Sequence, residues 1–445
     1  MLTIDQRLSY GLGDFGINLY FMSVMSYLLF FYTEVYGISA SVAAGVFFVA
    51  RLVDAISDPL MGYLADRTRS RWGRFRPYLF WGPIPLALIT VATFTVPDFD
   101  EFGKVLWAYL TYTAFGIIYT VVTIPYAGMT SVLTDNHQER ATLSTVRMAC
   151  AFSGGILVST FLPSFVEWFG GNARGYQNTM SLFAVVATLL LWITFARTRE
   201  RISAQTLKNL RITDSVRVIG RNPPLGVVML LFTFGMLAFT FRQAAAPYHF
   251  TYNVQRPDLI GDYFGVTLGV MTLSLVVIPY LTRRFDKAGA IRIGAMVALV
   301  GGCGFYLTPP DDIFWTFVWG SVLAVGGAPV AVLCWAMIPD TIEYAQLRTG
   351  IRADGVVFAT ASFFQKLAKA IGGAGVAALL AWFGYVANQP QTVEAKEGIL
   401  LMMSVCPLVV NVLLFLVSFF YRLDSRAHAE IVAALKAKNH LSVDP

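Results

Sequence analysis

The feature that most constrains this chain is a series of long apolar runs. Hydropathy predicts about twelve spans, each near the roughly 20 residues that cross about 30 Å of hydrocarbon. The predicted spans lie near residues 10–33, 39–65, 77–97, 104–133, 141–165, 178–197, 225–250, 259–282, 290–308, 313–338, 355–385 and 398–421. Only 13% of the residues are charged, against roughly 25% in soluble domains, so the bilayer is the expected solvent. We therefore predict an all-α membrane protein.

The loops predict the orientation and the division of the chain. Arginine and lysine gather in one alternating set of loops, which predicts a bacterial-type inner membrane protein with both termini in the cytoplasm. The longest polar stretch before the tail separates two halves of six spans. We predict two pseudo-symmetric six-helix bundles, 1–197 and 225–421, a central cytoplasmic loop, 198–224, and a cytoplasmic tail, 422–445. This is the layout of major facilitator transporters.

Three charged residues interrupt the second apolar run. Arg51, Asp54 and Asp58 are spaced by three and four residues, so they share one helix face. Two carboxylates one turn apart, with the Ser57 hydroxyl, offer oxygen ligands for Na⁺ or a proton. A structural ion pair with Arg51 is the alternative. Because one arginine cannot neutralise two acids, a coupling cation site is favoured.

Several polar residues are predicted at a similar depth in different spans. Counting from the cytoplasmic ends gives Asn18, Asp58, Thr123, Arg147 and Lys366. Together they predict one cavity near the midplane. A buried lysine at position 366 should pair with an acid of span two. The alternative is that its side chain reaches back to the interface.

Hydroxyls and aromatic rings gather on span four. Tyr119, Thr120, Thr123 and Tyr126 lie around the IPYAG sequence, and Trp335 lies before Pro339. Sugars present hydroxyl rims and C–H faces, which such side chains recognise. For each residue, ordinary helix packing is the alternative.

Two charged loops are candidates for a gate on the cytoplasmic side. Asp340, Glu343 and Arg352 lie in or beside the loop predicted over 339–355. Asp66, Arg67 and Arg71 lie in the arginine-rich loop after span two. Ion pairs that form in one state only would latch this side, and a solvated connector is the alternative.

Several motifs in the same order resemble the glycoside–pentoside–hexuronide:cation symporters, which include melibiose permease. They are SYGLGDFG, RLVDAISDP with GYLADRTRSRWGRFRP, IPY, PDTIEY with TGIRADG, and QKLAKAIGGA, spread over essentially the whole chain. The resemblance implies a cation site at Asp54 and Asp58, joined by Thr120. It also implies that Lys366 links the cation and sugar sites and that Arg147 lies near the sugar.

The chain departs from that permease where the sugar and the ion are chosen. Asn18 and Thr123 stand at the positions of its sugar-binding acids, and Ala127 replaces its tryptophan. Ser57 replaces an asparagine of its cation site. These differences argue against melibiose and leave Na⁺ and H⁺ both open.

We therefore predict a secondary active transporter that couples Na⁺ or H⁺ to uptake of a sugar or glycoside by alternating access. The substrate class is a pentoside, hexuronide or oligosaccharide. Arg147 and Arg242 would suit an acidic sugar, unless Asp14, Asp54 or Asp58 neutralises them. Alternatives are a cation-coupled carrier or flippase of a larger amphipathic solute, and a membrane sensor on the same scaffold.

Other classes of function find no support in the sequence. The four histidines are scattered, with no catalytic or metal spacing, which argues against an enzyme. No cationic face with interleaved aromatic residues indicates nucleic-acid binding. We expect a monomer in the bilayer that needs no cofactor beyond the co-transported cation.

Overall fold

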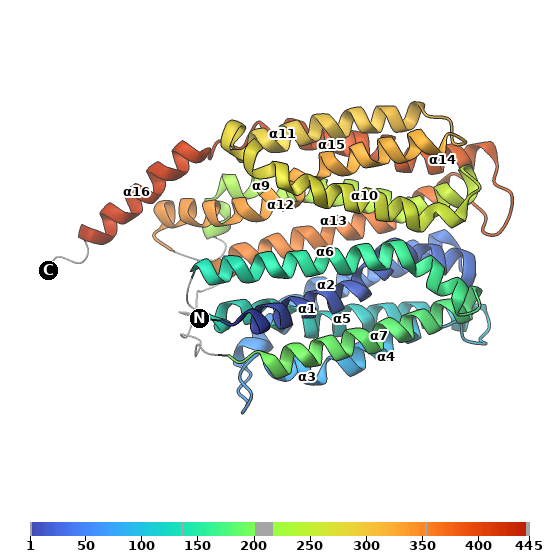
Figure 1. The fold of residues 1–445 in the computed structure, drawn as a ribbon, viewed down its shortest axis with the longest axis horizontal. Coiled ribbons are helices and arrows are strands. Elements are labelled where there is room, and N and C mark those ends of the chain that lie inside the picture. The colour runs from blue at the N-terminus through green and yellow to red at the C-terminus, as the bar shows by residue number, and fades with distance from the viewer. Residues whose placement is uncertain (1, 135–136, 201–216, 352–353, 442–445) are drawn as a thin grey trace. The chain divides into compact units, whose positions relative to one another are not determined.

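The protein is described by a computed structural model that covers residues 2–134, 137–200, 217–351 and 354–441. Every regular element in these ranges is helical, which confirms the all-α prediction. In chain order they are α1 Ile4–Ser23, η1 Val24–Leu28, η2 Phe31–Tyr36, α2 Ala40–Arg67, α3 Arg76–Trp81, α4 Pro83–Thr93, α5 Glu101–Leu133, α6 His137–Trp168, α7 Asn172–Arg197, α9 Pro223–Tyr248, η3 His249–Asn253, η4 Pro257–Leu259, α10 Ile260–Ser274, η5 Leu275–Val277, α11 Ile278–Leu307, α12 Ile313–Thr349, α13 Asp354–Trp382, α14 Val393–Met403, α15 Val405–Ser418 and α16 Ser425–Leu441 (Figure 1).

Local sequence signals set the helix ends. The side chains of Thr3, Ser39, Asp100 and Asp312 each accept a hydrogen bond from a backbone N–H of the first turn that follows. Such caps satisfy donors that have no partner within the helix. The first helical run ends at Gly37, whose φ of 87° lies in the left-handed region that favours glycine.

Within the described residues, nine helices are long and apolar enough to cross a membrane by length and composition. The first predicted span is divided among α1, η1 and η2, and the third is divided between α3 and α4. A continuous helical segment of 51 residues, Pro257–Leu307, covers two other predicted spans. It is too long for one crossing, and Asp286 breaks its helical backbone with a φ of 59°. The count of twelve spans stays a prediction.

The chain forms two compact units. Unit 1 comprises Met1–Gln205, Gln243–Gly265 and Gly373–Ile399, and unit 2 comprises Thr206–Arg242, Val266–Gly372 and Leu400–Pro445. Segments from the second half of the sequence thus belong to unit 1. The predicted boundaries of the two bundles remain untested by this division.

In unit 1, α1 packs against α6 and α7, and α2 packs against α5. Small residues allow the closest approach: a Cβ atom on Gly16 of α1 would lie 3.2 Å from the Ala187 Cα atom of α7. The α2–α5 contact places the charged face of α2 beside the polar face of α5.

In unit 2, α11 packs along α12 and α15. The core of this unit is apolar and includes Val228, Phe232, Ile291, Leu333 and Met337. The tail contains the helix α16, which contacts α12.

Candidate functional site

Two helix faces in register build the candidate site of unit 1. The face of α2 carries Arg51, Asp54 and Asp58, at steps of three and four residues. The facing side of α5 carries Tyr112, Gly116 and Thr120, at steps of four. Each residue of α2 meets one residue of α5, so three successive turns of the two helices contribute to one cluster.

The first of these turns contains a buried ion pair. Arg51 Nη1 lies 2.6 Å from Asp54 Oδ2, and Arg51 Nη2 donates to the Tyr112 hydroxyl at 2.6 Å. Asp54 is only 3% exposed. The ion pair that the sequence offered as an alternative therefore forms, but it uses only one of the two acids' carboxylates.

Asp54 has a second oxygen that points toward α5. Its Oδ1 atom is buried and has no hydrogen-bond partner among the described residues. A Cβ atom on Gly116 would lie 2.6 Å from this oxygen, so glycine is what allows the carboxylate to sit there. A buried, unpartnered carboxylate oxygen is costly, and a cation or a proton would remove that cost.

The next turn completes the cluster. Thr120 Oγ1 donates a hydrogen bond to Asp58 Oδ1 at 2.8 Å. The Ser57 hydroxyl donates to the Asp54 carbonyl at 3.4 Å, a weak contact. The predicted cation-binding residues Asp54, Ser57, Asp58 and Thr120 thus lie within one short stretch of α2 and α5. Their role in cation binding stays a prediction.

A second ion pair joins α1 and α6. Arg147 Nε donates to Asp14 Oδ2 at 2.5 Å, and its Nη1 donates to Thr130 Oγ1 at 3.1 Å. The guanidinium also lies over the rings of Tyr10 and Tyr126, at 5.5 Å and 4.9 Å from their centroids. Such contacts hold the planar cation on several sides.

The remaining predicted sugar-site residues of unit 1 surround this pair or lie along α5. Asn18 Nδ2 donates to the Asp14 carbonyl at 2.9 Å. The Tyr126 hydroxyl donates to the Tyr10 carbonyl at 2.5 Å, and its side chain is buried. Tyr119 packs beside Phe115, and Thr123 is partly exposed on α5. Their contact with a sugar stays a prediction.

Two predicted sugar-site residues belong to unit 2. Trp335 meets Phe232 edge to face at 5.0 Å and packs against the apolar core of that unit. Lys366 lies partly exposed on α13. The proposed partnership of Lys366 with the acids of α2 stays a prediction.

The predicted gating residues have partners that the sequence did not identify. In unit 2, Asp340 Oδ2 lies 2.6 Å from Lys287 Nζ, and Glu343 Oε2 lies 2.5 Å from His428 Nε2 of α16. The Glu343–His428 contact ties the tail helix to α12. Both acids lie on α12, which continues to Thr349, so the loop predicted from residue 339 begins later than expected. A gating role for either acid stays a prediction.

In unit 1, two of the predicted gating arginines lie over aromatic rings. Arg67 lies over Tyr63 at 4.1 Å, and Arg71 lies over Trp72 at 4.8 Å. The Asp66 side chain and all of Arg352 lie outside the described part of the structure.

One polar cluster in unit 1 was missed entirely. Tyr252 donates to Glu34 Oε2 at 2.5 Å, and the Asn388 side chain donates to the Glu34 carbonyl at 2.8 Å. Thr33 and Tyr248 share a hydrogen bond of 2.7 Å beside it. These residues come from three distant parts of the chain and have no common spacing. No sequence pattern brings them together.

Other missed residues did leave a signal. Tyr112 and Gly116 precede the predicted Thr120 at a four-residue spacing that marks one helix face. Pairing that face with the acidic face of α2 would have identified both Tyr112 and Gly116.

Known proteins are similar to this chain over almost its full length. The family described as MFS/sugar transport protein matches residues 9–425. The uncharacterized symporter YnaJ of Bacillus subtilis (strain 168) is 34% identical over 451 residues, which cover 100% of this chain and 97% of that protein. The isoprimeverose transporter of Lactiplantibacillus pentosus is 35% identical over 450 residues, covering 99% and 92% of the two chains.

The fold is also found among solved structures. A D-xylose-proton symporter superposes with a TM-score of 0.68 at 16% identity, covering 94% of this chain and 97% of that one. At this identity the likeness shows the fold alone. The two sequence comparisons confirm the resemblance to the glycoside–pentoside–hexuronide:cation symporters. This chain belongs to the MFS/sugar transport protein family of integral membrane transporters.

Proposed function

We propose that this protein is a symporter that uses a Na⁺ or proton gradient to accumulate a sugar or glycoside. The observation that carries the proposal is the buried Asp54 carboxylate, whose Oδ1 atom has no partner among the described residues. Asp58 and Thr120 supply further oxygens one turn away. Oxygen ligands suit a hard cation, and a carboxylate in a poorly hydrated site also accepts a proton.

Coupling follows from the charge of this cluster. The α2 face carries two acids and one arginine, and Arg51 is bonded to Asp54. Binding of Na⁺ or H⁺ at the unpartnered Asp54 oxygen neutralises buried negative charge and lowers the cost of burying it. Sugar binding and cation binding then favour the same access state, whereas a half-loaded carrier retains a buried charge. Differential binding to the two access states is what drives the conversion.

The second ion pair supports a neutral sugar over a hexuronide. Arg147 would suit an acidic sugar if its charge were uncompensated, but Asp14 lies 2.5 Å from it. Asp14, Asn18 and Thr130 instead offer acceptors and donors for sugar hydroxyls around that arginine. One relative is named as an isoprimeverose transporter, which also supports a glycoside as cargo.

We further propose that both termini lie in the cytoplasm and that the monomer is the transporting unit. The bias of arginine and lysine toward one set of loops supports the orientation. No cofactor takes part besides the co-transported cation.

Uptake by proteoliposomes tests the proposal. The panel would contain galactosides, xylosides, glucosides and glucuronides, each with an imposed Na⁺ gradient and, separately, a proton gradient. We expect accumulation of one neutral glycoside class under one of the two gradients. If no sugar accumulated under either gradient, the proposal would be contradicted and a carrier of a larger amphipathic solute would be favoured. Accumulation of glucuronides alone would contradict the proposal that the substrate is neutral.

A further inference from the structure

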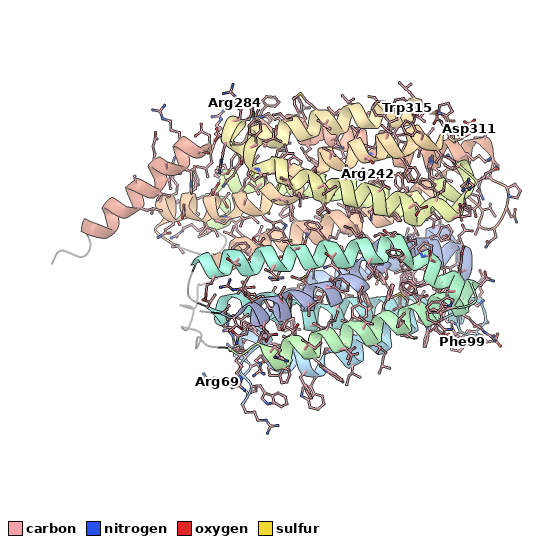
Figure 2. The ribbon with its side chains drawn as sticks, in the orientation of Figure 1. Arg69, Phe99, Arg242, Arg284, Asp311 and Trp315 are labelled. Atoms are coloured by element: carbon pink, nitrogen blue, oxygen red, sulfur yellow. The ribbon has the colours of Figure 1, made fainter. Side chains whose placement is uncertain are left out.

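A basic surface pocket of unit 1 lies outside the acid cluster, and one of its lining residues, Arg71, is also a predicted gating residue. Its volume is about 610 Å³. It is formed by the loop between α2 and α3 and by the end of α7, and its lining residues are Arg71, Trp72, Gly73, Arg76, Phe195, Ala196, Arg199 and Glu200. Figure 2 labels Arg69 in this loop.

The walls of the pocket are held by specific contacts. The Glu200 carboxylate accepts hydrogen bonds from the backbone N–H groups of Arg74, Phe75 and Arg76, at 2.9, 2.7 and 3.2 Å. Arg76 Nη2 donates to the Phe195 carbonyl at 2.8 Å, which ties the loop to α7. The pocket is therefore a built feature and not the surface of a loose loop.

The charge of the pocket is positive. Three lining arginines face one lining glutamate, and the oxygens of that glutamate already accept three backbone donors. Burial and the neighbouring Arg199 lower the pKa of Arg76. The buried Nε atom of Arg76 has no hydrogen-bond partner among the described residues. An anion between the guanidinium groups would relieve the repulsion and supply an acceptor.

An exposed apolar stripe leads along α7 to this pocket. Val185, Leu189 and Ile193 are 59%, 51% and 41% exposed, and they lie one turn apart on one face of the helix. The next residue of that face, Ala196, lines the pocket. The distance from Val185 to Ala196 is about 16 Å, at 1.5 Å per residue. It matches half of the roughly 30 Å hydrocarbon thickness.

We propose that this pocket binds the phosphate headgroup of an anionic membrane lipid, with the acyl chains lying along the exposed stripe of α7. The arginines donate hydrogen bonds to the phosphate oxygens. The length of the stripe places the pocket at the depth of the lipid headgroups. A soluble phosphate presents the same anionic group but has no acyl chains to lie along the stripe. A lipid headgroup and a soluble phosphate can therefore be distinguished by experiment.

The test is native mass spectrometry of the full, delipidated protein titrated with phosphatidylglycerol or phosphatidylethanolamine. We expect tighter binding of phosphatidylglycerol to the wild type. Arg199→Gln should weaken that binding about fivefold, the effect of one arginine at a membrane surface. The matched control is Arg197→Gln, since Arg197 is on the same helix end, is ion-paired with Asp5 and does not line the pocket.

Arg199 is exposed, so its substitution should leave folding intact. Arg76→Gln should weaken binding further, but it also removes the tie to α7. Equal losses in Arg197→Gln and Arg199→Gln would overturn the proposal, because they would indicate only diffuse attraction. A wild type that binds both lipids equally would also overturn it.

Inorganic phosphate and glycerol 3-phosphate distinguish the source of the anion. We expect millimolar concentrations of either to leave phosphatidylglycerol bound. Displacement of the lipid at micromolar concentrations would assign the pocket to a soluble phosphate and overturn the lipid assignment.

Discussion

Two arginine–aspartate pairs inside unit 1, Arg147–Asp14 and Arg51–Asp54, are similar in burial but differ in how far their hydrogen-bonding groups are satisfied. Arg147 and Asp14 form a one-to-one pair, and Thr130 and two tyrosine rings occupy other sides of the guanidinium. Arg51 is bonded to Asp54, but the same helix face also carries Asp58. The Asp54 Oδ1 atom has no partner among the described residues.

We propose that this difference separates a structural pair, Arg147–Asp14, from a functional one, Arg51–Asp54. A satisfied pair fixes the geometry of its surroundings and gains little from a further charge. A pair with a buried, unpartnered carboxylate oxygen gains stability when a cation or proton binds there. We therefore expect substitutions at the α2 acids to affect coupling and substitutions at Arg147 and Asp14 to affect stability and sugar affinity.

The largest effect is expected from Asp58→Asn. An asparagine at position 58 offers no anionic oxygen to the cation, so concentrative sugar uptake should fall about 100-fold, near the upper end of typical coupling energies. Exchange of sugar down its gradient should persist. The control is Asp258→Asn, because Asp258 is exposed and paired with Arg256. Normal concentrative uptake by Asp58→Asn would remove the distinction between the two pairs.

Breaking the Arg147–Asp14 pair should lower the stability of the protein. Asp14→Asn leaves the Arg147 charge buried without its counterion and should lower the free energy of unfolding by about 3 kcal/mol. The Asp14→Asn/Arg147→Gln double variant should recover part of this loss. Denaturant titration in mild detergent measures the free energy of unfolding of both variants. Breaking the exposed Arg197–Asp5 pair is the control, and it should cost at most about 1 kcal/mol.

A methyl group added to α5 at Gly116 should disturb the Arg51–Asp54 pair and leave the Arg147–Asp14 pair unchanged. Gly116→Ala places a Cβ atom 2.6 Å from Asp54 Oδ1 in the present geometry, so the carboxylate must move. Overpacking of this kind costs about 2 kcal/mol, equivalent to about a 30-fold loss of cation affinity. Gly269→Ala is the control, since nothing lies within 4 Å of the added atom there. Equal cation dependence of uptake in the two variants would place the cation elsewhere.

Removal of one hydroxyl should weaken the same site less. Thr120→Val deletes the 2.8 Å hydrogen bond to Asp58. A hydrogen bond to a charged group contributes about 1.5 kcal/mol, so the cation concentration for half-maximal uptake should rise about tenfold. Thr120→Ser should retain most of the affinity. An unchanged half-maximal concentration in Thr120→Val would exclude this hydroxyl from the cation site.

Substitution of Glu139, an acid outside both pairs, should have the smallest effect, which is a change in how stability depends on pH. The Thr134 hydroxyl and the Leu2 N–H donate to Glu139, and these bonds lower the pKa of Glu139 below its usual 4.5. A lowered pKa stabilises the fold above pH 4.5, and this contribution is lost as the pH falls through the lowered pKa. Wild type should therefore melt above Glu139→Gln at pH 7, with the gap closing in acid. A gap independent of pH would contradict this assignment.

The sequence was enough to predict the elements of the α2 site but not all of its contacts. Helical periodicity placed Arg51, Asp54 and Asp58 on one face, and the family resemblance identified Thr120. It did not reveal that Gly116 allows the Asp54 oxygen to approach α5, because interhelical distance and register depend on packing along both helices. The all-α fold followed from hydropathy because the bilayer requires internally satisfied backbones.

The sequence also left the partner of Arg147 undecided among several acids. The structure selects Asp14, which comes from a helix 133 positions earlier in the chain. The Glu34, Tyr252 and Asn388 cluster was equally out of reach, since only the tertiary fold brings those segments together. Periodic signals within one helix are thus readable, whereas pairings between distant segments are not.

The central claim is that the acids of α2 bind the coupling cation, and ion movement tests it most directly. Unenergised proteoliposomes would receive an outside pulse of the transported sugar while internal Na⁺ and pH are recorded. The wild type should carry one of these ions inward with the sugar, and Asp58→Asn should move sugar without any ion. Sugar-driven ion entry that persists in both Asp58→Asn and Asp54→Asn would contradict the account.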